Sequence, residues 1–521
     1  MRIAFRMDFS ARIGGGHLMR CLTLANLLKH RGAECCFITG ATTTALIEKI
    51  NDQGHKVVAL HERDDSEAPV VRIPNAPGYE AWLPVHWSVD AQATQSALRG
   101  EGDFDWLIVD HYALDANWES AVRSQVKQLM VIDDLANRPH DCDLLLDQNY
   151  HADPTSRYAG RVPQHCDLLL GPRYALLRPE FHAMHNRRQK RQRVSSILIF
   201  FGSVDITDES RRVLRIFAAH TEWDVDIDVV TGSLNPNLTS LQSECAAMSR
   251  CSLHVDTPDM ARLVAAADLA IGAGGSHSWE RACVGVPSIV IATAANQIEV
   301  AESLACTGAH LYLGPSGSVT ETHLRSAIEL FFLTPTLLDF FSTQSMSLCD
   351  GAGAERVSAR LLQSSVMVRP ATAQDCDMIY AWRNAEETRR YSFDPAPISM
   401  LDHRKWFAQV IGNPDRSLLI GECCGRACGV IRYDFDHDIA VVSIYLDPQQ
   451  IGTGLGTGLL RSGTDYVARK YPKIRKIHAH IQADNRRSAL SFEKAGFTPE
   501  RSTFSLDLSL STNSISTQGF P

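Results

Sequence analysis

The chain has 521 residues, and a typical size of about 100 to 200 residues per domain predicts three domains. Hydrophobic residues make up 45% of the chain and charged residues 21%, as is typical of a soluble globular protein. A net charge of −9 excludes the overall positive field with which nucleic acid or an anionic membrane would be held.

Cysteine spacing and the apolar runs indicate a cytoplasmic protein. The 14 cysteines include two adjacent pairs, Cys35 with Cys36 and Cys423 with Cys424, and no double Cys-x-x-C of the zinc type. No apolar run is long enough to cross a bilayer. We therefore expect reduced thiols, no bound metal, no membrane association and a cytoplasmic location.

Residues 1–190 alternate between strand-like and helical segments. A helix is expected from Gly16 to His30, ending before Gly32, with apolar residues recurring at steps of three and four. The strand-like runs are RIAFRMD, ECCFITG, KVVAL, DWLIVDH and QLMVIDD. This alternation predicts a parallel, doubly wound sheet.

The basic run RRQKRQR, residues 187–193, is interpreted as a solvated linker that separates two sheets. Residues 191–363 then repeat the alternation, with strands expected at SSILIFFG, DVDIDVVTG, CSLHVD, ADLAIGAGG, PSIVIA and HLYLG. Two doubly wound domains that meet at a cleft form a GT-B arrangement, with ligands beyond the carboxyl ends of the strands. Residues 364–521 form a third, α+β domain.

The stretch RIGGGHLMRC places three glycines, Gly14, Gly15 and Gly16, where the first strand gives way to the helix. Bare amides and the positive helix end can hold a phosphate there, although the turn lacks the dinucleotide spacing and the P-loop lysine. A purely structural turn is the alternative. His17 favours function, because the helix N-terminus disfavours the imidazolium and leaves a neutral base.

The stretch GAGGSHSWERACVGVPSIVIATAANQ, residues 272–297, reads as strand, glycine turn, helix from about Ser276, strand and polar loop. The turn can present amides to a diphosphate. Glu280 is a candidate for the ribose hydroxyls, or else forms only a surface pair with Arg281. The residues expected to bind the nucleotide sugar from this half are Gly274, Gly275, Ser276, Glu280, Gln297 and Asn296.

Four stretches together resemble one family: RMDFSARIGGGHLMRCLTLANLL, LIVDHYALDANWE, LLLGPRYALLRPEF and the one just described. They are similar to the nucleotide-sugar hydrolases of pseudaminic acid biosynthesis, which are related to MurG-type glycosyltransferases. The resemblance covers residues 1–363. It implies hydrolysis of UDP-2,4-diacetamido-2,4,6-trideoxy-β-L-altropyranose at the anomeric carbon, giving UDP and the free sugar.

Carried onto this chain, the resemblance implies catalytic roles for His17, Tyr112 and Asn296, and nucleotide-sugar binding by Arg20. Two positions depart from the family pattern: His277 stands where threonine is usual, and Ser203 replaces the second glycine of an FGG turn. Glycosidic hydrolysis normally uses two carboxyl groups, but UDP is already a weak base, so a single general base suffices. We expect His17 to activate the water and Asp8 or a backbone group to orient it.

The third region contains YLDPQQIGTGLGTGLL, residues 445–460, in which a strand, a glycine turn and a helix from about Gly456 succeed one another. With HAHIQADNRRSALSFEKAGF it resembles the GNAT acetyltransferases over residues 366–510. AWRNAEETRRYSF and DHRKWFAQVI resemble the acetyltransferase of the same sugar pathway. That resemblance implies transfer of acetyl from acetyl-CoA to the 4-amino group of a UDP-amino sugar.

The acetyl-CoA contacts implied by the GNAT resemblance are Leu446, Ile451, Gly452, Gly454, Gly456, Thr457, Asn485 and Phe492. Splayed central strands near Leu446 would expose amides to the acetyl carbonyl. Phe492 stands where many relatives have a tyrosine that protonates the departing thiolate, so solvent supplies that proton or the domain is impaired. The general base stays open among Glu422, His403 and Tyr445, and Trp382 and Trp406 are expected in the core or a pocket wall.

The acetyltransferase would make the substrate that the hydrolase consumes, so one chain would perform two consecutive steps that feed flagellin glycosylation. Its expected partners are UDP-amino sugars and acetyl-CoA, and the oligomeric state is not indicated. The alternative is a GT-B glycosyltransferase fused to a protein N-acetyltransferase. A binding role without catalysis is a third class.

Overall fold

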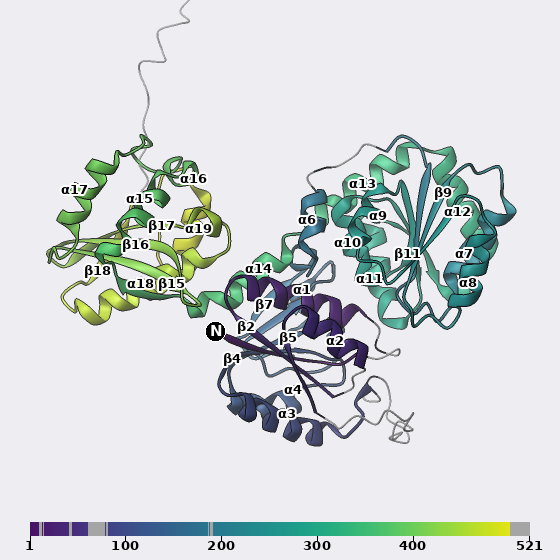
Figure 1. The fold of residues 1–521 in the computed structure, drawn as a ribbon, viewed down its shortest axis with the longest axis horizontal. Helices are drawn as coiled ribbons and strands as arrows, with labels where there is room; N and C mark the ends of the chain where they lie inside the picture. Colours follow the sequence, from purple (N-terminus) through teal and green to yellow (C-terminus); the bar gives the residue numbers. More distant parts are fainter. Residues whose placement is uncertain are drawn as a thin grey trace, which may run out of the picture. The chain divides into compact units, whose positions relative to one another are not determined.

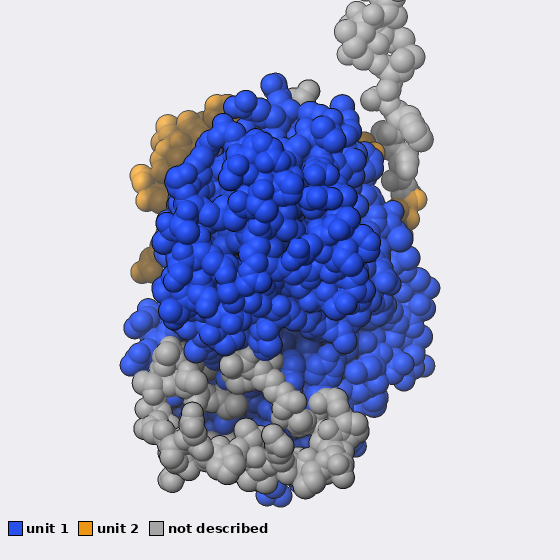
Figure 2. All heavy atoms as spheres, turned by 90° about the vertical axis from the view of Figure 1, so that its right-hand side faces the viewer, with its two compact units in different colours: residues 1–365, 424–426 blue, residues 366–423, 427–521 orange. Residues whose placement is uncertain are grey.

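The computed structural model describes residues 1–9, 13, 15–40, 44–60, 79, 82–185, 187 and 191–500. Gly14, part of the predicted glycine turn, lies outside them. The chain divides into two compact units, residues 1–365 with 424–426, and residues 366–423 with 427–521 (Figures 1 and 2). In the described ranges, no helix combines the length and the apolar character needed to span a membrane.

The first sheet has seven parallel strands in the order β3-β2-β1-β4-β5-β6-β7 (Figure 1). Its strands are β1 (Arg2–Met7), β2 (Glu34–Thr39), β3 (Lys56–Ala59), β4 (Phe104–Asp110), β5 (Val126–Ile132), β6 (Leu144–Asp147) and β7 (Asp167–Leu170). The order reverses between β1 and β4, where Met7 pairs with Asp110. Ligands of doubly wound sheets bind at such a switch point, beyond the carboxyl ends of the strands.

The helices between the strands of this sheet are α1 (Gly16–His30), α2 (Thr44–Asp52), α3 (Trp87–Glu101), α4 (Ala116–Val122) and α5 (Pro154–Arg157). α6 (Pro179–His185) follows the last strand, β7, and packs against helices of the second half. The predicted helix Gly16–His30 is confirmed in both bounds. Leu18, Cys21, Leu22, Ala25 and Leu28 are all buried, as their three- and four-residue spacing predicts. β1 and β4 are buried along almost their whole length because helices cover both faces of a parallel sheet.

The second sheet has six parallel strands in the order β10-β9-β8-β11-β12-β13, so its switch point lies between β8 and β11. The strands are β8 (Ser196–Phe200), β9 (Asp226–Thr231), β10 (Cys251–Val255), β11 (Leu269–Ala273), β12 (Ser288–Ala292) and β13 (Leu311–Pro315). The helices are α7 (Glu209–Ala219), α8 (Leu238–Ala246), α9 (Met260–Ala266), α10 (His277–Val284), α11 (Ala295–Cys306) and α12 (Glu321–Leu333). The expected pair of Rossmann-like sheets is confirmed.

Two helices, α13 (Thr336–Leu348) and α14 (Gly353–Leu362), follow the second sheet. α14 packs against α1 of the first half, and Arg31 Nη1 donates to Ser358 Oγ at 2.5 Å. At its start, a Cβ on Gly353 would lie 2.2 Å from the Ala175 carbonyl oxygen and 2.5 Å from its nitrogen. Only glycine allows this approach of helix to backbone.

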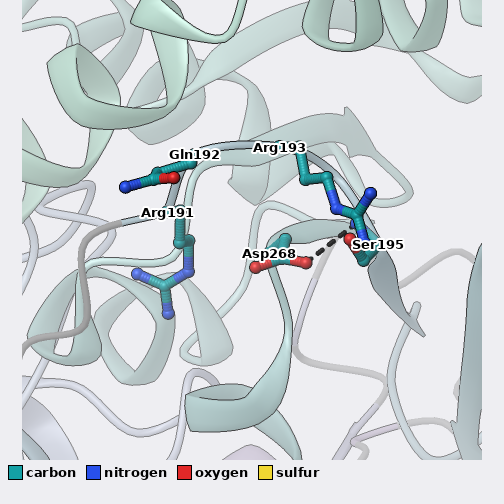
Figure 3. Close-up of a pocket in the computed structure, with 5 residues that line it drawn as sticks. All are labelled: Arg191, Gln192, Arg193, Ser195 and Asp268. Atoms are coloured by element: carbon teal, nitrogen blue, oxygen red, sulfur yellow. Dashed lines mark hydrogen bonds between the residues drawn. The ribbon is translucent and has the colours of Figure 1, made fainter.

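The basic run 187–193 is only partly the solvated linker expected from its charge. Arg191 is buried and donates from Nε to Ala267 O at 2.8 Å and from Nη1 to Gly285 O at 2.9 Å. Around it lies a polar hollow of about 410 Å³, where Ser195 N donates to Asp268 (Figure 3). Residues 188–190 lie outside the described ranges. Because the hollow lies at the amino ends of β8 and β11, it is separate from the predicted ligand edge.

The third sheet is mixed, with the order β14-β15-β16-β17-β18. Its elements are β14 (Met367–Pro370), α15 (Cys376–Asn384), α16 (Glu386–Arg389), α17 (Met400–Val410), β15 (Arg416–Cys423), β16 (Arg426–Asp436), β17 (Ile439–Leu446), α18 (Leu455–Lys470), β18 (Lys476–Ala479) and α19 (Arg486–Lys494). β17 and β18 run parallel and pair only as far as Val442 with Ala479. The last residues of β17, up to Leu446, therefore extend beyond this pairing, as the predicted splay requires.

Replacing Gly353 with alanine is expected to destabilise the N-terminal unit by about 1 to 3 kcal/mol, because backbone atoms of Ala175 cannot yield to the new methyl group. Thermal unfolding followed by circular dichroism measures the loss. Gly100 in α3 is the matched control, since no atom lies within 4 Å of its Cβ position. Gly100→Ala should be neutral or stabilising, and equal unfolding temperatures for the two variants would contradict the packing argument.

Candidate functional site

His17 lies in the first turn of α1, with its imidazole against a carboxylate at the switch point of the first sheet. Its Nδ1 is 2.5 Å from Oδ1 of Asp110, the last residue of β4. Arg20 Nη2 is also near Nδ1, at 3.3 Å, but the carboxylate is much closer. A proton on Nδ1 that is donated to Asp110 leaves the lone pair on Nε2, which is the tautomer required of a base.

Arg20 fixes the same carboxylate from the next turn of α1. Its Nε donates to Asp110 Oδ2 at 2.7 Å and its Nη2 to Oδ1 at 2.6 Å, a bidentate pairing. Burial by itself raises the pKa of Asp110, but Arg20 and His17 outweigh it and hold that pKa well below its usual range. Arg20 also lies 3.3 Å from Asp134, so its guanidinium is bound to carboxylates of the protein.

Aromatic rings enclose His17. Tyr112 packs edge-on at 4.7 Å between ring centroids and Trp82 at 5.9 Å, while Tyr79 lies 4.9 Å from Tyr112. Burial, together with the nearby Asp134 carboxylate, raises the pKa of Tyr112 well above its ordinary value. Its phenol therefore stays protonated. The predicted pair of His17 and Tyr112 is brought together as neighbours.

Asp8, which is expected to orient the water, is hydrogen-bonded to groups of the protein itself. It is fully buried and accepts hydrogen bonds from Arg6 Nη1 at 2.6 Å and from Gly40 N at 2.7 Å, and His111 Nε2 is 3.2 Å from its Oδ2. The carboxylate that contacts His17 is Asp110, which sequence reasoning missed. Its signal was the DHY stretch, an acidic residue at the carboxyl end of an apolar strand.

The second half contributes the glycine turn between β11 and α10. A Cβ on Gly274 would lie 3.4 Å from Gln297 Cβ, and one on Gly275 would lie 3.6 Å from Gln297 Nε2. Gln297 Oε1 accepts from Thr293 N at 3.0 Å, which fixes the amide beside the turn. Asn296 is exposed in the same first turn of α11. Gly274, Gly275 and Gln297 are therefore together, as predicted.

The glycine turns of the two halves lie against each other. A Cβ on Gly16 would be 3.5 Å from Ser276 Oγ, and one on Gly15 would be 3.5 Å from Ser203 Oγ. The N-termini of α1 and α10 therefore lie close to each other. Because helix N-termini carry partial positive charge and free amides, this juxtaposition suits an anion such as a diphosphate.

Glu280 contacts a histidine and an arginine. Its Oε2 accepts from His277 Nδ1, and its Oε1 is 3.8 Å from Arg178 Nη2. Arg281, the alternative partner, is buried and donates instead to Ala273 O at 3.0 Å and to Ser278 Oγ at 3.1 Å. The alternative of an exposed Glu280–Arg281 pair is therefore wrong.

A buried histidine lies between a carboxylate of α4 and one that follows β5. His140 Nδ1 is 2.7 Å from Glu119 Oε1, and its Nε2 is 3.8 Å from Asp133 Oδ2. Burial by itself lowers the pKa of His140, but Asp133 and Glu119 together raise it to about 9. The imidazolium thus balances the negative charge of Glu119 and of Asp133, which directly precedes Asp134.

The glycine turn of the second unit joins β17 to α18. Gly452 and Gly454 have φ values of +86° and +81°, which side chains rarely adopt. Gly454 caps α18, so the amides of residues 451–456 lie at its N-terminus, where a pyrophosphate binds favourably. Leu446 Cδ1 lies 3.8 Å from the Cβ position of Gly456. Buried Thr457 belongs to the first turn of this helix.

Two residues predicted to contact acetyl-CoA have structural partners. Asn485 caps α19 by accepting from Ser488 N at 3.1 Å. Phe492 is buried and packs edge-to-face on Phe497, with ring centroids 5.0 Å apart. A phenylalanine ring has no proton to donate, so this position cannot protonate a thiolate.

Two of the three candidate bases of the second unit have hydrogen-bond partners, and the third, Tyr445, packs against the core. Glu422 accepts from Arg369 Nε at 2.7 Å, and His403 Nε2 is 3.0 Å from Cys376 O. Burial lowers the pKa of His403 and raises that of Tyr445. The arrangement therefore singles out none of the three. The expected wall residues Trp382 and Trp406 are partly buried against the core of this unit.

Known proteins resemble both regions of the chain. Residues 365–498 match the family model of the acetyltransferase (GNAT) domain. UDP-2,4-diacetamido-2,4,6-trideoxy-beta-L-altropyranose hydrolase of Campylobacter jejuni is 29% identical over 266 residues, which is 51% of this chain and 81% of that protein. An uncharacterized protein of Methanocaldococcus jannaschii is 22% identical over 516 residues, 95% of this chain and 96% of its own.

Among solved structures, MurG of Acinetobacter baumannii covers 69% of this chain and 99% of its own length, with 15% identity and a TM-score of 0.46. The match to the hydrolase and the match to the GNAT model bear out both resemblances stated from the sequence. The chain thus combines a pair of Rossmann-like domains, similar to a UDP-sugar hydrolase, with a C-terminal GNAT acetyltransferase domain.

Replacing His140 with glutamine is expected to cost stability at pH 6 and progressively less above pH 7. A histidine whose pKa is raised from 6.5 to about 9 stabilises the fold fully below pH 6.5, and this contribution is lost as the pH rises through 9. At pH 6, the free energy of unfolding of the variant should be lower than that of wild type by about 3 kcal/mol at most. Urea unfolding at pH 6 and at pH 9.5 measures this difference at each pH.

Exposed His165, 3.5 Å from Asp143, provides the control for this measurement. His165→Gln should show the same small stability change at both pH values. A gap for His140→Gln that does not depend on pH would rule out the buried imidazolium.

Proposed function

We propose that residues 1–363 hydrolyse UDP-2,4-diacetamido-2,4,6-trideoxy-β-L-altropyranose to UDP and the free sugar. We propose further that residues 364–521 acetylate the 4-amino group of the preceding UDP-amino sugar with acetyl-CoA. The observation that best supports the proposed hydrolase activity is the His17–Asp110 pair, which lies beside two helix N-termini. The similarity to the Campylobacter jejuni hydrolase supports the choice of sugar.

Hydrolysis requires a base for water more than an acid for the leaving group. Asp110 keeps the proton of His17 on Nδ1, so Nε2 accepts a proton from water as the water oxygen attacks the anomeric carbon. The bond from that carbon to the β-phosphate oxygen breaks, and its electron pair leaves with UDP. The proton on Nε2 passes to solvent afterwards, which restores the base.

The diphosphate is a good leaving group when its charge is stabilised where it develops. The amides at the starts of α1 and α10 supply this stabilisation without lysine, and Gln297 adds a side-chain amide beside the second turn. Loss of one such donor in comparable sites costs about 3 kcal/mol. Tyr112 and Trp82 exclude bulk water from the imidazole and form an apolar wall for the sugar.

Acetyl transfer in the second domain depends mainly on backbone geometry. The glycine turn at residues 451–456 binds the pyrophosphate of acetyl-CoA, and the splayed end of β17 exposes amides to the thioester carbonyl. The neutral amine attacks this carbonyl and the carbon–sulfur bond breaks. The nitrogen gives up one proton to solvent as the amide forms, and the thiolate takes a proton from solvent because Phe492 has none to give. The product is the substrate of the hydrolase.

Incubation with UDP-4-amino-4,6-dideoxy-N-acetyl-β-L-altrosamine and acetyl-CoA, followed by mass spectrometry, tests both steps. Wild type should yield CoA, UDP and the free diacetamido sugar with no acceptor present. His17→Ala should accumulate the diacetylated UDP-sugar, with turnover of hydrolysis reduced about a thousandfold and UDP affinity nearly unchanged. Asp110→Asn should lower kcat with little change in KM, because it removes the group that fixes the tautomer.

Failure to release sugar without an acceptor would favour a glycosyltransferase. Loss of UDP binding in His17→Ala would make His17 a ligand contact and contradict its role as the base.

Gly452→Ala is expected to weaken acetyl-CoA binding at least about tenfold, because a methyl group and a strained φ both disturb the pyrophosphate turn. Gly412→Ala is the matched control: its φ is +78° and its Cβ position is equally open, but it follows α17, away from the turn. Both variants should lose about 1 kcal/mol of stability. Equal acetyl-CoA affinity in the two, measured by calorimetry, would contradict the proposed site.

A further inference from the structure

A buried histidine follows the second glycine turn, at the start of α10. The side chain of His277 is 9% exposed, and its ring packs edge-on against Phe200, the last residue of β8, with centroids 4.8 Å apart. Nδ1 is hydrogen-bonded to Glu280. Nε2 is buried and has no hydrogen-bond partner among the residues that the structure describes.

An unpartnered buried nitrogen at this place is costly, since leaving a polar group without a partner costs about 1 to 3 kcal/mol. The imidazole lies at the carboxyl-end edge of the second sheet, where the glycine turn also lies, because His277 directly follows Ser276 and its ring contacts Phe200 at the carboxyl end of β8. Ser276 Oγ in turn lies against Gly16 of the first half. Nε2 is therefore a polar group without a partner among the described residues, in a side chain that directly follows the turn predicted to hold the diphosphate.

The charges around His277 favour a neutral ring in the free protein. Burial lowers its pKa, and Arg281 and Arg178 act in the same direction, while the Glu280 carboxylate raises it. With Nδ1–H donated to Glu280, a neutral ring carries only a lone pair on Nε2. A lone pair repels a phosphate oxygen, so the neutral ring cannot bind the anion directly.

We infer that His277 takes up one proton when a nucleoside diphosphate binds at the Gly274–Ser276 turn, and that its Nε2–H then binds a phosphate oxygen. This inference deepens the proposed hydrolase function and rests on it. The negative charge of the diphosphate favours the imidazolium, and Glu280 balances the charge on the other side of the ring. The proton comes from solvent on binding and returns to solvent when UDP leaves.

The imidazolium would act during the reaction as well. As the bond between the anomeric carbon and the phosphate oxygen breaks, charge develops on the β-phosphate, and a cation held by Glu280 stabilises it. His277 thereby assists the leaving group, whereas His17 activates the water. The threonine usual at this position in the resembled family offers a hydroxyl but no charge.

Calorimetry of UDP binding to the full chain tests the inference, in two buffers of different ionisation enthalpy at pH 8. UDP is then fully ionised, since a phosphate has its second pKa near about 6. Wild type should take up between about 0.5 and 1 proton for each UDP bound, and His277→Thr should take up none. Glu280→Gln should reduce the uptake, because it removes the counter-charge.

Equal proton uptake by wild type and His277→Thr would overturn the inference. A second measurement needs no variant: UDP affinity of wild type should fall by up to about tenfold for each pH unit between pH 7.5 and 9. A flat profile would overturn the inference even if His277→Thr did not fold. Failure of wild type to bind UDP at any pH would instead contradict the proposed function itself.

Discussion

The buried carboxylate of Asp110 organises the first half of the candidate site. A carboxylate out of contact with water must be paired and hydrogen-bonded, and here Arg20 binds both of its oxygens while His17 occupies one of them. His17 and Arg20 stand three residues apart on one face of α1, so one carboxylate fixes the rotation of that helix over the sheet. The same contact fixes the tautomer of the imidazole and leaves Nε2 to act.

In the proposed reaction, the two halves of the N-terminal unit divide the chemistry between them. The first half would supply the base and its aromatic surroundings, and the second would supply the glycine turn, Gln297 and the His277–Glu280 pair. The N-termini of α1 and α10 lie close together, through Gly16 and Ser276. Under this proposal, turnover requires both halves.

The acetyltransferase domain also has a glycine turn at a helix N-terminus. Its glycine turn precedes α18 as those of the first unit precede α1 and α10, and again free amides replace cationic side chains. The turn before α18 requires positive φ values at Gly452 and Gly454. Of the candidate bases of this domain, Glu422 and His403 are hydrogen-bonded to neighbouring groups, and Tyr445 packs against the core.

Local patterns in the sequence determined the elements: strand and helix periodicity predicted the two doubly wound sheets, the bounds of α1 and the glycine turns, because these depend on neighbours a few residues apart. Partners distant in the chain were decided only by the tertiary structure. Strand order sets Met7 beside Asp110, so the acid on His17 is Asp110, while Asp8 is bound by Arg6. Burial of Arg191 likewise corrected in part what charge alone suggested for the basic run, because the surroundings of a guanidinium depend on packing that no local pattern encodes.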